Sequence, residues 1–182
     1  MDINKEKNII RKQIKYIKSK LNAEDKLLLS KPIILNLENN NDFINSTCIL
    51  AYWSMNDEVN THAFVQKWSS SKDIYLPVVK GNMLEFRLFT NINNMEKESE
   101  FGIFEPKGKI LKDYTIIDLA IIPGVAFDNH NNRLGRGLAF YDKILKSIDA
   151  KKIGICFNFQ ILDIIPTENT DIKMDMIISS KP

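Results

Sequence analysis

Residues 121–142 read IIPGVAFDNHNNRLGRGLAFYD, and we expect this stretch to decide both the fold and the chemistry of the chain. The short apolar run at residues 117–122 ends at Pro123-Gly124, which predicts a buried strand that stops at the edge of a sheet. A second apolar piece, residues 125–127, precedes residues 128–132, DNHNN, which favour turns and tolerate positive φ. The stretch therefore predicts a strand followed by a turn-rich loop.

The loop leads into a predicted ligand site. Residues 138–148 carry apolar side chains at helical spacing, so a helix should begin directly after the sequence RLGRG at residues 133–137. Glycines before a helix N-terminus let a ligand approach the backbone, and the free N–H groups favour an anion. A glycine pair alone is more often simple turn chemistry. Arg133 and Arg136 supply bidentate donors, and with them the motif predicts a phosphate-binding loop.

Length and composition restrict the class of protein. A chain of 182 residues, 44% hydrophobic and 26% charged, fits one globular domain, residues 1–182. The net charge of +2, from 25 basic and 23 acidic residues, argues against a nucleic acid as the main partner. No apolar run approaches the ~20 residues that span a bilayer, and the N-terminus is charged. We therefore expect no membrane partner and a cytoplasmic location.

Cysteine and histidine point to no catalytic or metal chemistry of their own. Cys48 and Cys156 both lie in predicted buried strands and are expected to be reduced core residues. The only histidines, His62 and His130, lack the spacing of a zinc site. No G-x-S-x-G motif occurs, which argues against a Ser-His-Asp hydrolase.

The N-terminal region predicts two helices. The helix expected at residues 5–21 has an apolar stripe of Ile10, Ile14, Ile17 and Leu21. An adjacent basic stripe comprises Lys7, Arg11, Lys15 and Lys18. Such a stripe is most often a solvated face. A second helix, capped by Asn22, should cover residues 23–37, kinked or divided by Pro32, before a polar surface loop at residues 38–45.

The remaining pattern alternates strands and helices. A strand at residues 47–53, a turn at 54–61 and a helix at 62–69 precede a hairpin formed by residues 74–79 and 83–89. Further strands are expected at residues 152–157 and 176–179. In parallel α/β sheets ligands bind beyond the carboxyl ends of the strands, so the turn with Glu58 and the glycine loop can face one crevice. Asp57 and Glu58 by themselves would most often be helix-start carboxylates.

Several of these segments together closely resemble the signature of the 5-formyltetrahydrofolate cyclo-ligase family, also called methenyltetrahydrofolate synthetases. The matching segments are PGVAFD at 123–128, RLGRG at 133–137, Tyr141-Asp142, the spacing of Met55, Glu58, Val59 and Thr61, the run 102–106, and Gln160, Pro166, Asp171 and Asp175. The resemblance implies a single α/β domain of the ribose-5-phosphate isomerase/CoA-transferase-like type, with a parallel-rich sheet flanked by helices. The alternation of strands and helices agrees with it.

The resemblance also implies an enzyme of one-carbon metabolism, a ligase that converts 5-formyltetrahydrofolate to 5,10-methenyltetrahydrofolate with ATP and Mg²⁺ and releases ADP and phosphate. We expect a monomer whose partners are these small molecules. Arg136 would be the catalytic residue that stabilises the transferred phosphoryl group. The implied ATP contacts are Lys7, Arg11, Arg133, Leu134, Gly135, Arg136, Gly137, Leu138, Ala139, Phe140 and Tyr141. The implied folate contacts are Trp53, Met55, Glu58, Arg136 and Phe140, with a further pocket role for Phe101, Phe104 and Glu105. Asp142 and Asp171 would approach the magnesium ion.

The sequence departs from the family at one place. Family members usually read Lys-Gly-Tyr where this chain has Leu138-Ala139-Phe140, so a phosphate-side lysine is missing. Losing one charged hydrogen bond costs about 1.5–3 kcal/mol, and alanine disfavours a left-handed backbone. The alternative is therefore a catalytically weakened folate- or nucleotide-binding relative. A nucleic-acid binder built on the basic helix is a third hypothesis, although an aromatic stacking set is absent.

Overall fold

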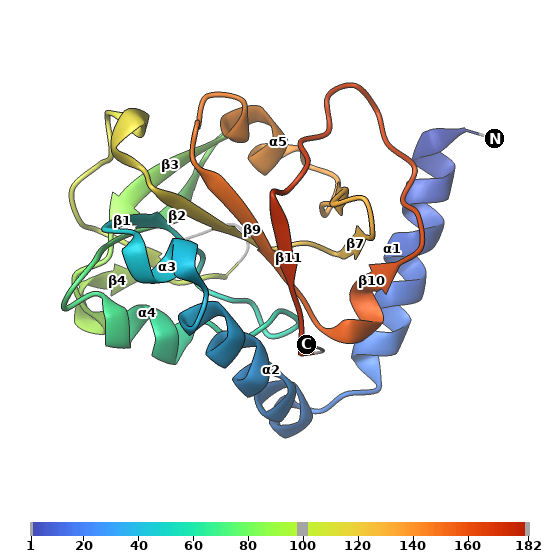
Figure 1. Ribbon diagram of the computed structural model, residues 1–182, viewed down its shortest axis with the longest axis horizontal. Helices are drawn as coiled ribbons and strands as arrows, with labels where there is room; N and C mark the ends of the chain where they lie inside the picture. The colour runs from blue at the N-terminus through green and yellow to red at the C-terminus, as the bar shows by residue number, and fades with distance from the viewer. Residues whose placement is uncertain (1, 98–101, 181–182) are drawn as a thin grey trace.

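A mostly parallel six-stranded sheet forms the centre of the molecule, described here by a computed structural model for residues 2–97 and 102–180. The sheet has the order β11-β9-β6-β1-β2-β3, and only the β2–β3 hairpin is antiparallel (Figure 1). Its strands are β1 (Cys48–Leu50), β2 (Asp73–Lys80), β3 (Met83–Leu88), β6 (Leu119–Ile122), β9 (Lys151–Ile155) and β11 (Met176–Ile178). The predicted parallel-rich α/β fold is confirmed, including the hairpin, whose turn places Gly81 at φ +57°.

Both faces of the sheet are buried, as parallel strands require. The helices are α1 (Ile3–Ser19), α2 (Ala23–Glu38), α3 (Asn41–Asn45), α4 (His62–Trp68) and α5 (Phe140–Leu145). Ile49 of β1 packs in one core with residues of α2, α3 and α4, whereas its neighbours Cys48 and Leu50 pack in a second core with Leu145 of α5. This alternation follows from the two-residue period of a strand. Burial raises the pKa of the Cys156 thiol to about 12, in keeping with the predicted reduced core cysteines.

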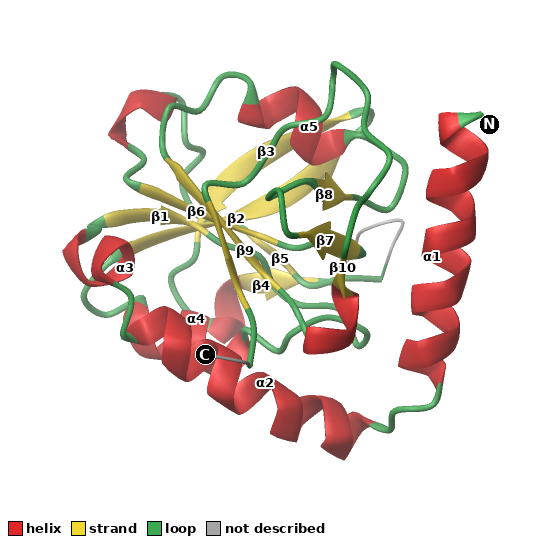
Figure 2. Cartoon of the chain, turned by 45° about the vertical axis from the view of Figure 1, so that its right-hand side comes forward, coloured by secondary structure: helices red, strands yellow, loops and turns green. Residues whose placement is uncertain are grey.

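The first helix does not cover the main sheet. Instead, α1 lies beside a small sheet of β10 (Ile161–Leu162), β7 (Ala126–Asp128) and β8 (Arg133–Leu134), as Figure 2 shows. Ile14 packs there against Ala126 and Leu134. The elements left over are β4 (Met95–Glu96), β5 (Glu105–Pro106) and the 3-10 turns η1 (Ile92–Asn94), η2 (Tyr114–Ile116) and η3 (Asn158–Gln160).

The expected solvated basic stripe on α1 is wrong in its main feature. Lys7 and Lys18 are only 4% and 5% exposed, and they share the inward face with Arg11 and Ile14 at spacings of four, three and four residues. Ile17, assigned to the packing stripe, is exposed, as is Lys15. The reason is the partner of the helix, because α1 packs partly on polar loops whose carboxylates accept its lysines.

Three other local expectations are adjusted by the structure. Asn22 caps α2 as predicted, and Asp25 completes a capping box, but Pro32 lies within an undivided α2. The loop expected at residues 38–45 contains α3, whose Phe43 is fully buried against Phe64 and Trp68. The helix expected at residues 138–148 is shorter, Phe140–Leu145. Short polar segments form such helices when one aromatic residue gains a buried site, which sequence periodicity cannot register.

The predicted turn at residues 128–132 is built around a buried carboxylate. Asp128, 1% exposed, accepts hydrogen bonds from the backbone N–H groups of His130, Asn132 and Ile165 and from the Asn132 side chain. Burial alone would raise the pKa of Asp128, but these donors outweigh it and the pKa is lowered. Asn131 takes the left-handed conformation with φ 63°, as the residue types predicted. The loop that precedes the glycine motif is thereby fixed.

A buried amide fixes the strand end beside it. The Gln160 side chain donates from Nε2 to the carbonyls of Gly124 and Val125, each at 2.9 Å. A Cβ at Gly124 would lie 2.5 Å from the Phe127 ring, so only glycine fits at this turn. Across residues 2–97 and 102–180, no helix has the length and apolarity needed to span a bilayer.

Candidate active site

A cavity of about 320 Å³ opens beyond the carboxyl ends of β1 and β6. Strand β1 pairs with β2 on one side and with β6 on the other, so the chain connections diverge at this point and leave a crevice. The cavity is lined by Tyr52, Trp53, Met55, Glu58, Pro77, Val79, Leu84, Ile103, Phe104, Glu105, Pro123, Gly124, Arg133, Gly135, Arg136, Leu138, Ala139, Phe140, Tyr141 and Asp142. Its walls are mainly apolar and its charged groups are few, which suits a flat organic ligand with a polar edge.

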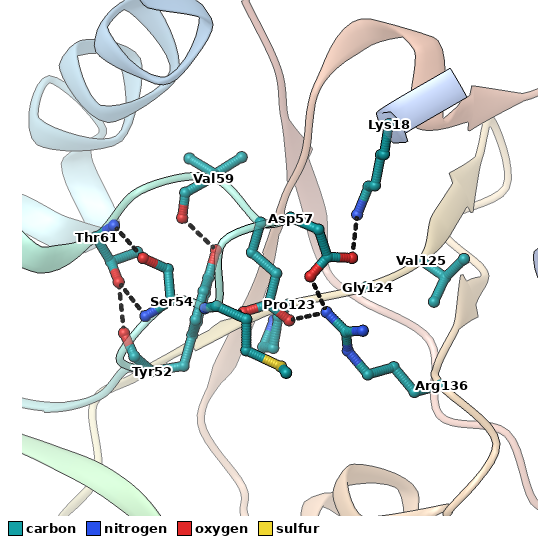
Figure 3. Close-up of polar contacts among 12 residues, drawn as sticks. Lys18, Tyr52, Ser54, Asp57, Val59, Thr61, Pro123, Gly124, Val125 and Arg136 are labelled. Carbon is teal, nitrogen blue, oxygen red and sulfur yellow. Dashed lines mark hydrogen bonds and ion pairs between the residues drawn. The ribbon is translucent and has the colours of Figure 1, made fainter. Parts of the chain in front are cut away.

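The loop after β1 is held by its own hydrogen bonds. Thr61 donates from Oγ1 to the Tyr52 carbonyl at 2.6 Å, and Ser54 and Thr61 bond each other through backbone N–H and hydroxyl groups (Figure 3). The Glu58 carboxylate accepts from the Met55 N–H at 2.9 Å. These contacts fix the Glu58 side chain at the cavity wall.

Trp53 forms part of this wall, and the His62 ring packs against it. Its ring stacks on His62 with centroids 4.1 Å apart, and the His62 Nε2 lies 2.9 Å from the Ser54 carbonyl oxygen. Burial lowers the pKa of His62 despite that contact. A neutral imidazole therefore packs against the indole, so His62 supports the wall and carries no charge into the cavity.

Asp57 and Glu58 do not cap the following helix, the role that such carboxylates most often have. Helix α4 begins at His62 after Thr61, which makes no side-chain capping bond. Both carboxylates bind Arg136 instead: its Nη2 donates to Asp57 at 2.6 Å and to Glu58 at 3.0 Å. Asp57 also forms an ion pair with Lys18 at 3.5 Å (Figure 3).

The charges in this cluster shift each other's pKa values. Burial would raise the pKa of Asp57, but Arg136 and Lys18 outweigh it and the pKa is lowered. Burial would lower the pKa of Arg136, but Glu58 and Asp57 raise it further. Asp57 and Arg136 are thereby kept ionised near neutral pH.

Arg133 is a buried arginine with an unusual set of contacts. Its Nη2 bonds Asp142 at 2.8 Å, its Nη1 bonds the Pro123 carbonyl at 3.2 Å, and its guanidinium lies over the Tyr141 ring. Its Nε is buried without a hydrogen-bond partner among the described residues. Arg133 therefore ties the β6 loop to the start of α5, and Asp142 also accepts a 3.4 Å bond from the Ile172 N–H.

Helix α1 contacts the glycine loop from outside the cavity. The Arg11 Nε donates to the Gly135 carbonyl at 2.9 Å, and its guanidinium lies next to Gly137, which has φ +105°. Lys7 pairs with Asp171 at 2.6 Å and with Glu168 at 2.9 Å. Arg11 and Lys7 therefore connect the first helix to the loops at residues 135–137 and 168–171.

The sequence model of the 5-formyltetrahydrofolate cyclo-ligase family matches residues 3–180. The chain belongs to this family. A 5-formyltetrahydrofolate cyclo-ligase from Haemophilus influenzae is 30% identical over 173 residues, which cover 91% of this chain and 92% of the relative. The mouse cyclo-ligase is 26% identical over 191 residues, covering 97% of this chain and 94% of the mouse protein.

Solved structures agree with the family membership. The NMR structure of a 5,10-methenyltetrahydrofolate synthetase from Aquifex aeolicus superposes with a TM-score of 0.86 at 29% identity, over 97% of this chain and 90% of that one. A synthetase from Mycoplasma pneumoniae, at 24% identity and a TM-score of 0.77 over the whole of both chains, shows the same fold. The predicted fold and family are confirmed.

The cyclo-ligase fold brings most of the predicted site residues to one cavity. These are Trp53, Met55, Glu58, Arg133, Gly135, Arg136, Leu138, Ala139, Phe140, Tyr141 and Asp142, together with Phe104 and Glu105. Lys7, Arg11, Gly137 and Asp171 lie outside it, in or behind the glycine loop and the C-terminal loop. The Leu134 side chain is core, packed on Ile14 and Ile165. Phe101 lies outside the described residues.

Sequence reasoning missed several lining residues and two charged neighbours of this cyclo-ligase site. Pro77, Val79 and Leu84 come from the β2–β3 hairpin, which the sequence predicted without any role in a site. Lys18 and Asp57 form the ion-pair cluster with Arg136 and Glu58. The one available signal was the helical spacing of Lys18 from Lys7 and Arg11, because three cations on one face imply carboxylates opposite.

Proposed function

We propose that the protein converts 5-formyltetrahydrofolate and ATP to 5,10-methenyltetrahydrofolate, ADP and phosphate. Its membership of the cyclo-ligase family supports this reaction. The observation that carries the proposal is the 3.0 Å bond between Arg136 and Glu58, which joins the loop after β1 to the glycine loop after β6. A folate anchor and a phosphoryl-binding arginine thus meet in one cavity.

The folate half of the cavity is the apolar wall with Glu58 at its edge. Glu58 is 10% exposed at its side chain and can accept two parallel hydrogen bonds from the N–H edge of a pterin. Trp53, Met55 and Phe140 offer flat or flexible apolar surface to the ring system. We assign these residues to folate binding.

The phosphate half is the glycine loop. Arg136, whose side chain is 44% exposed, can turn towards a phosphoryl group, and we assign it the catalytic role. Phosphoryl transfer to the formyl oxygen turns a poor leaving group into a good one, and the neighbouring N10 then closes the ring. The protein's task is to position both substrates and to stabilise charge on the phosphoryl oxygens. No protein nucleophile is needed.

The remaining predicted ATP contacts surround that loop. We assign Arg133, Gly135, Gly137, Leu138, Ala139, Phe140 and Tyr141 to the cavity side, with the Leu134 backbone, and Lys7 and Arg11 to the α1 side. The buried, unpartnered Nε of Arg133 supports an anionic ligand close to it.

Magnesium is assigned to Asp142 and Asp171. The described part of the chain has no group of three ligating side chains. Two separate carboxylates nevertheless fit Mg²⁺, which keeps several waters and binds largely through substrate phosphates. Asp142 bonds the N–H of Ile172, the residue after Asp171, so the two carboxylate-bearing segments are adjacent. When bound, the ion would neutralise charge on the phosphates.

The departure at residues 138–140 does not prevent a left-handed residue in the loop. Ala139 takes the left-handed conformation, φ 53° and ψ 19°, which a glycine would adopt without strain. Leu138 is exposed at the cavity, in the position of the usual lysine. We therefore retain the active cyclo-ligase as the proposal, in a single domain of residues 1–182 that acts as a cytoplasmic monomer.

The test is to mix purified protein with MgATP and 5-formyltetrahydrofolate and to follow the near-ultraviolet absorbance of the methenyl product. Omission of ATP or of the folate is the control. We expect product only when both substrates are present. Saturable binding without turnover would contradict the proposal and leave a ligand-binding relative.

A further inference from the structure

Lys18 is the buried end of a chain of four charged side chains. It extends from α1 towards the loop after β1, where it meets Asp57 at 3.5 Å (Figure 3). Within residues 2–97 and 102–180, Asp57 is its only ion-pair partner. A buried ammonium group is unfavourable unless it is paired, so Lys18 keeps the Asp57 carboxylate in place.

Asp57 is shared with a second cation. The Arg136 Nη2 that bonds Asp57 at 2.6 Å also bonds Glu58 at 3.0 Å. The cluster contains two positive and two negative side chains, so its net charge is zero. Its ends are buried, with Lys18 5% and Glu58 10% exposed, whereas Asp57 and Arg136 in the middle are 39% and 44% exposed. The middle of the cluster can therefore rearrange between fixed ends.

The charges determine what such a rearrangement costs. If a phosphate draws Arg136 away, Glu58 gains a free oxygen for a pterin N–H, and Asp57 loses its arginine. Lys18 remains beside Asp57 and still compensates its charge. Without Lys18, Arg136 would be the sole counter-ion of two adjacent carboxylates and would be released less readily.

We propose that Lys18 and Asp57 are positioning residues that set how readily Arg136 is released from Glu58 and thereby couple folate binding to nucleotide binding. The inference rests on the proposed function. Lys18 is not among the residues that line the cavity, and it acts through Asp57. Because such coupling is reciprocal, each substrate should strengthen the binding of the other.

The experiment measures kcat at saturating ATP, and the folate KM at an ATP concentration equal to its native KM, for five forms of the full chain. The forms are native, Lys18→Met, Lys18→Arg, the double variant Lys18→Met/Asp57→Asn, and Lys15→Met as an exposed control on the same helix. Thermal denaturation of each form reports folding separately.

We expect Lys18→Met to raise the folate KM about 5- to 20-fold, in the usual range of coupling between sites, with kcat changed less than about twofold. Lys18→Arg keeps the charge and should return the KM to within about threefold of native. The folate KM of the double variant should also return towards native, because Asp57→Asn leaves Glu58 as the one carboxylate from which Arg136 must be released. Lys15→Met should match the native protein.

Two outcomes overturn the inference alone. One is a native folate KM in folded Lys18→Met. The other is an equal rise of the folate KM in all Lys18 variants, the double variant included, together with a lower Tm. That result would show that Lys18 has a purely structural role. The double variant buries no unpaired charge. If Lys18→Met does not fold, the folate KM values of the double variant and of Lys18→Arg decide the test. A native chain that forms no methenyl product overturns the proposed function and the inference with it, so the two failures are distinct.

Discussion

The two ends of helix α1 carry buried lysines in contrasting surroundings. Lys7 near the N-terminus has two carboxylates, Asp171 and Glu168, within 2.9 Å, whereas Lys18 has Asp57 alone at 3.5 Å. Burial lowers the pKa of both, but the hydrogen bonds and charges of Asp171 and Glu168 outweigh it at Lys7, whose pKa is raised. At Lys18 burial prevails and the pKa is lowered.

The contrast separates a contact that anchors from one that can adjust. Lys7 satisfies its charge locally and ties α1 to the C-terminal loop. Lys18 shares its carboxylate with Arg136, which is also bound to Glu58. A charge with two carboxylates of its own stays paired when its surroundings change, whereas a shared carboxylate keeps one cation when the other moves away. The helix is thus fixed at one end and linked to the reacting groups at the other.

The largest expected effect is at Arg136. Arg136→Lys should lower kcat about 10²- to 10³-fold, because a lysine cannot reproduce the bidentate stabilisation of a phosphoryl group. Stability should change little, because the side chain is half-exposed. Steady-state kinetics and thermal denaturation check both, with Arg87→Lys on β3 as the control. A kcat within threefold of native would remove Arg136 from the catalytic role.

The next effect distinguishes the two lysines by stability. Lys7→Met should destabilise the protein by about 1–3 kcal/mol, because it removes two charged hydrogen bonds. Lys18→Met should cost less, because its partner Asp57 is 39% exposed and keeps Arg136 as a counter-ion, so no buried charge is left unpaired. Urea unfolding measures both, and the exposed Lys12→Met is the control. An equal loss in the free energy of unfolding for Lys7→Met and Lys18→Met would contradict the proposed difference between the two lysines.

A smaller effect tests the glycine loop, which Arg11 contacts between Lys7 and Lys18 on α1. Ala139→Gly should stabilise the protein by about 0.5–1 kcal/mol, because it relieves a left-handed alanine at φ 53°. The folate KM should stay native, because the contacts with Asp57 and Glu58 position Arg136. A large change in the folate KM would show instead that the backbone of this loop sets the position of the arginine. Calorimetry and kinetics provide the two readouts.

The smallest effect is the pH dependence of stability in the alkaline range. The folded pKa of Lys18 lies below 10.5, so just below that pH the unfolded chain binds more protons and stability rises with pH. The folded pKa of Lys7 lies above 10.5, so its stabilisation is complete below 10.5 and is lost as pH rises through the folded value. Lys18→Met should lack the rise, and Lys7→Met should lack the later fall. Urea titrations across this range measure the two slopes, and identical slopes in both variants would refute the assignment.

Local pattern was sufficient for much of the fold. The apolar run before Pro123 predicted β6, Asn22 as a helix cap predicted the start of α2, and the turn residues at 128–132 predicted a loop that contains a left-handed Asn131. These features depend on residues a few positions apart. The helix at Asn41–Asn45 could not be predicted in this way, because it depends on a distant pocket that accepts Phe43.

The sequence predicted which residues form the site better than it predicted the contacts between them. Glu58 and Arg136 line one cavity, as the two strand-end loops indicated. Their direct bond, across 78 positions of sequence, was not predicted, nor was the pairing of Arg133 with Asp142. The hairpin residues Val79 and Leu84 also reach the cavity without any distinguishing pattern.

The sequence by itself determined the strands of the main sheet, the glycine-arginine loop, the family and the shared helical face of Lys7, Arg11 and Lys18. The tertiary structure alone decided that two of these cations are buried and which carboxylates they meet, at separations as large as 164 residues. The physical reason is that periodicity specifies which side chains share a face. What that face packs against depends on the position of other segments, and a buried charge depends on that partner for its energy.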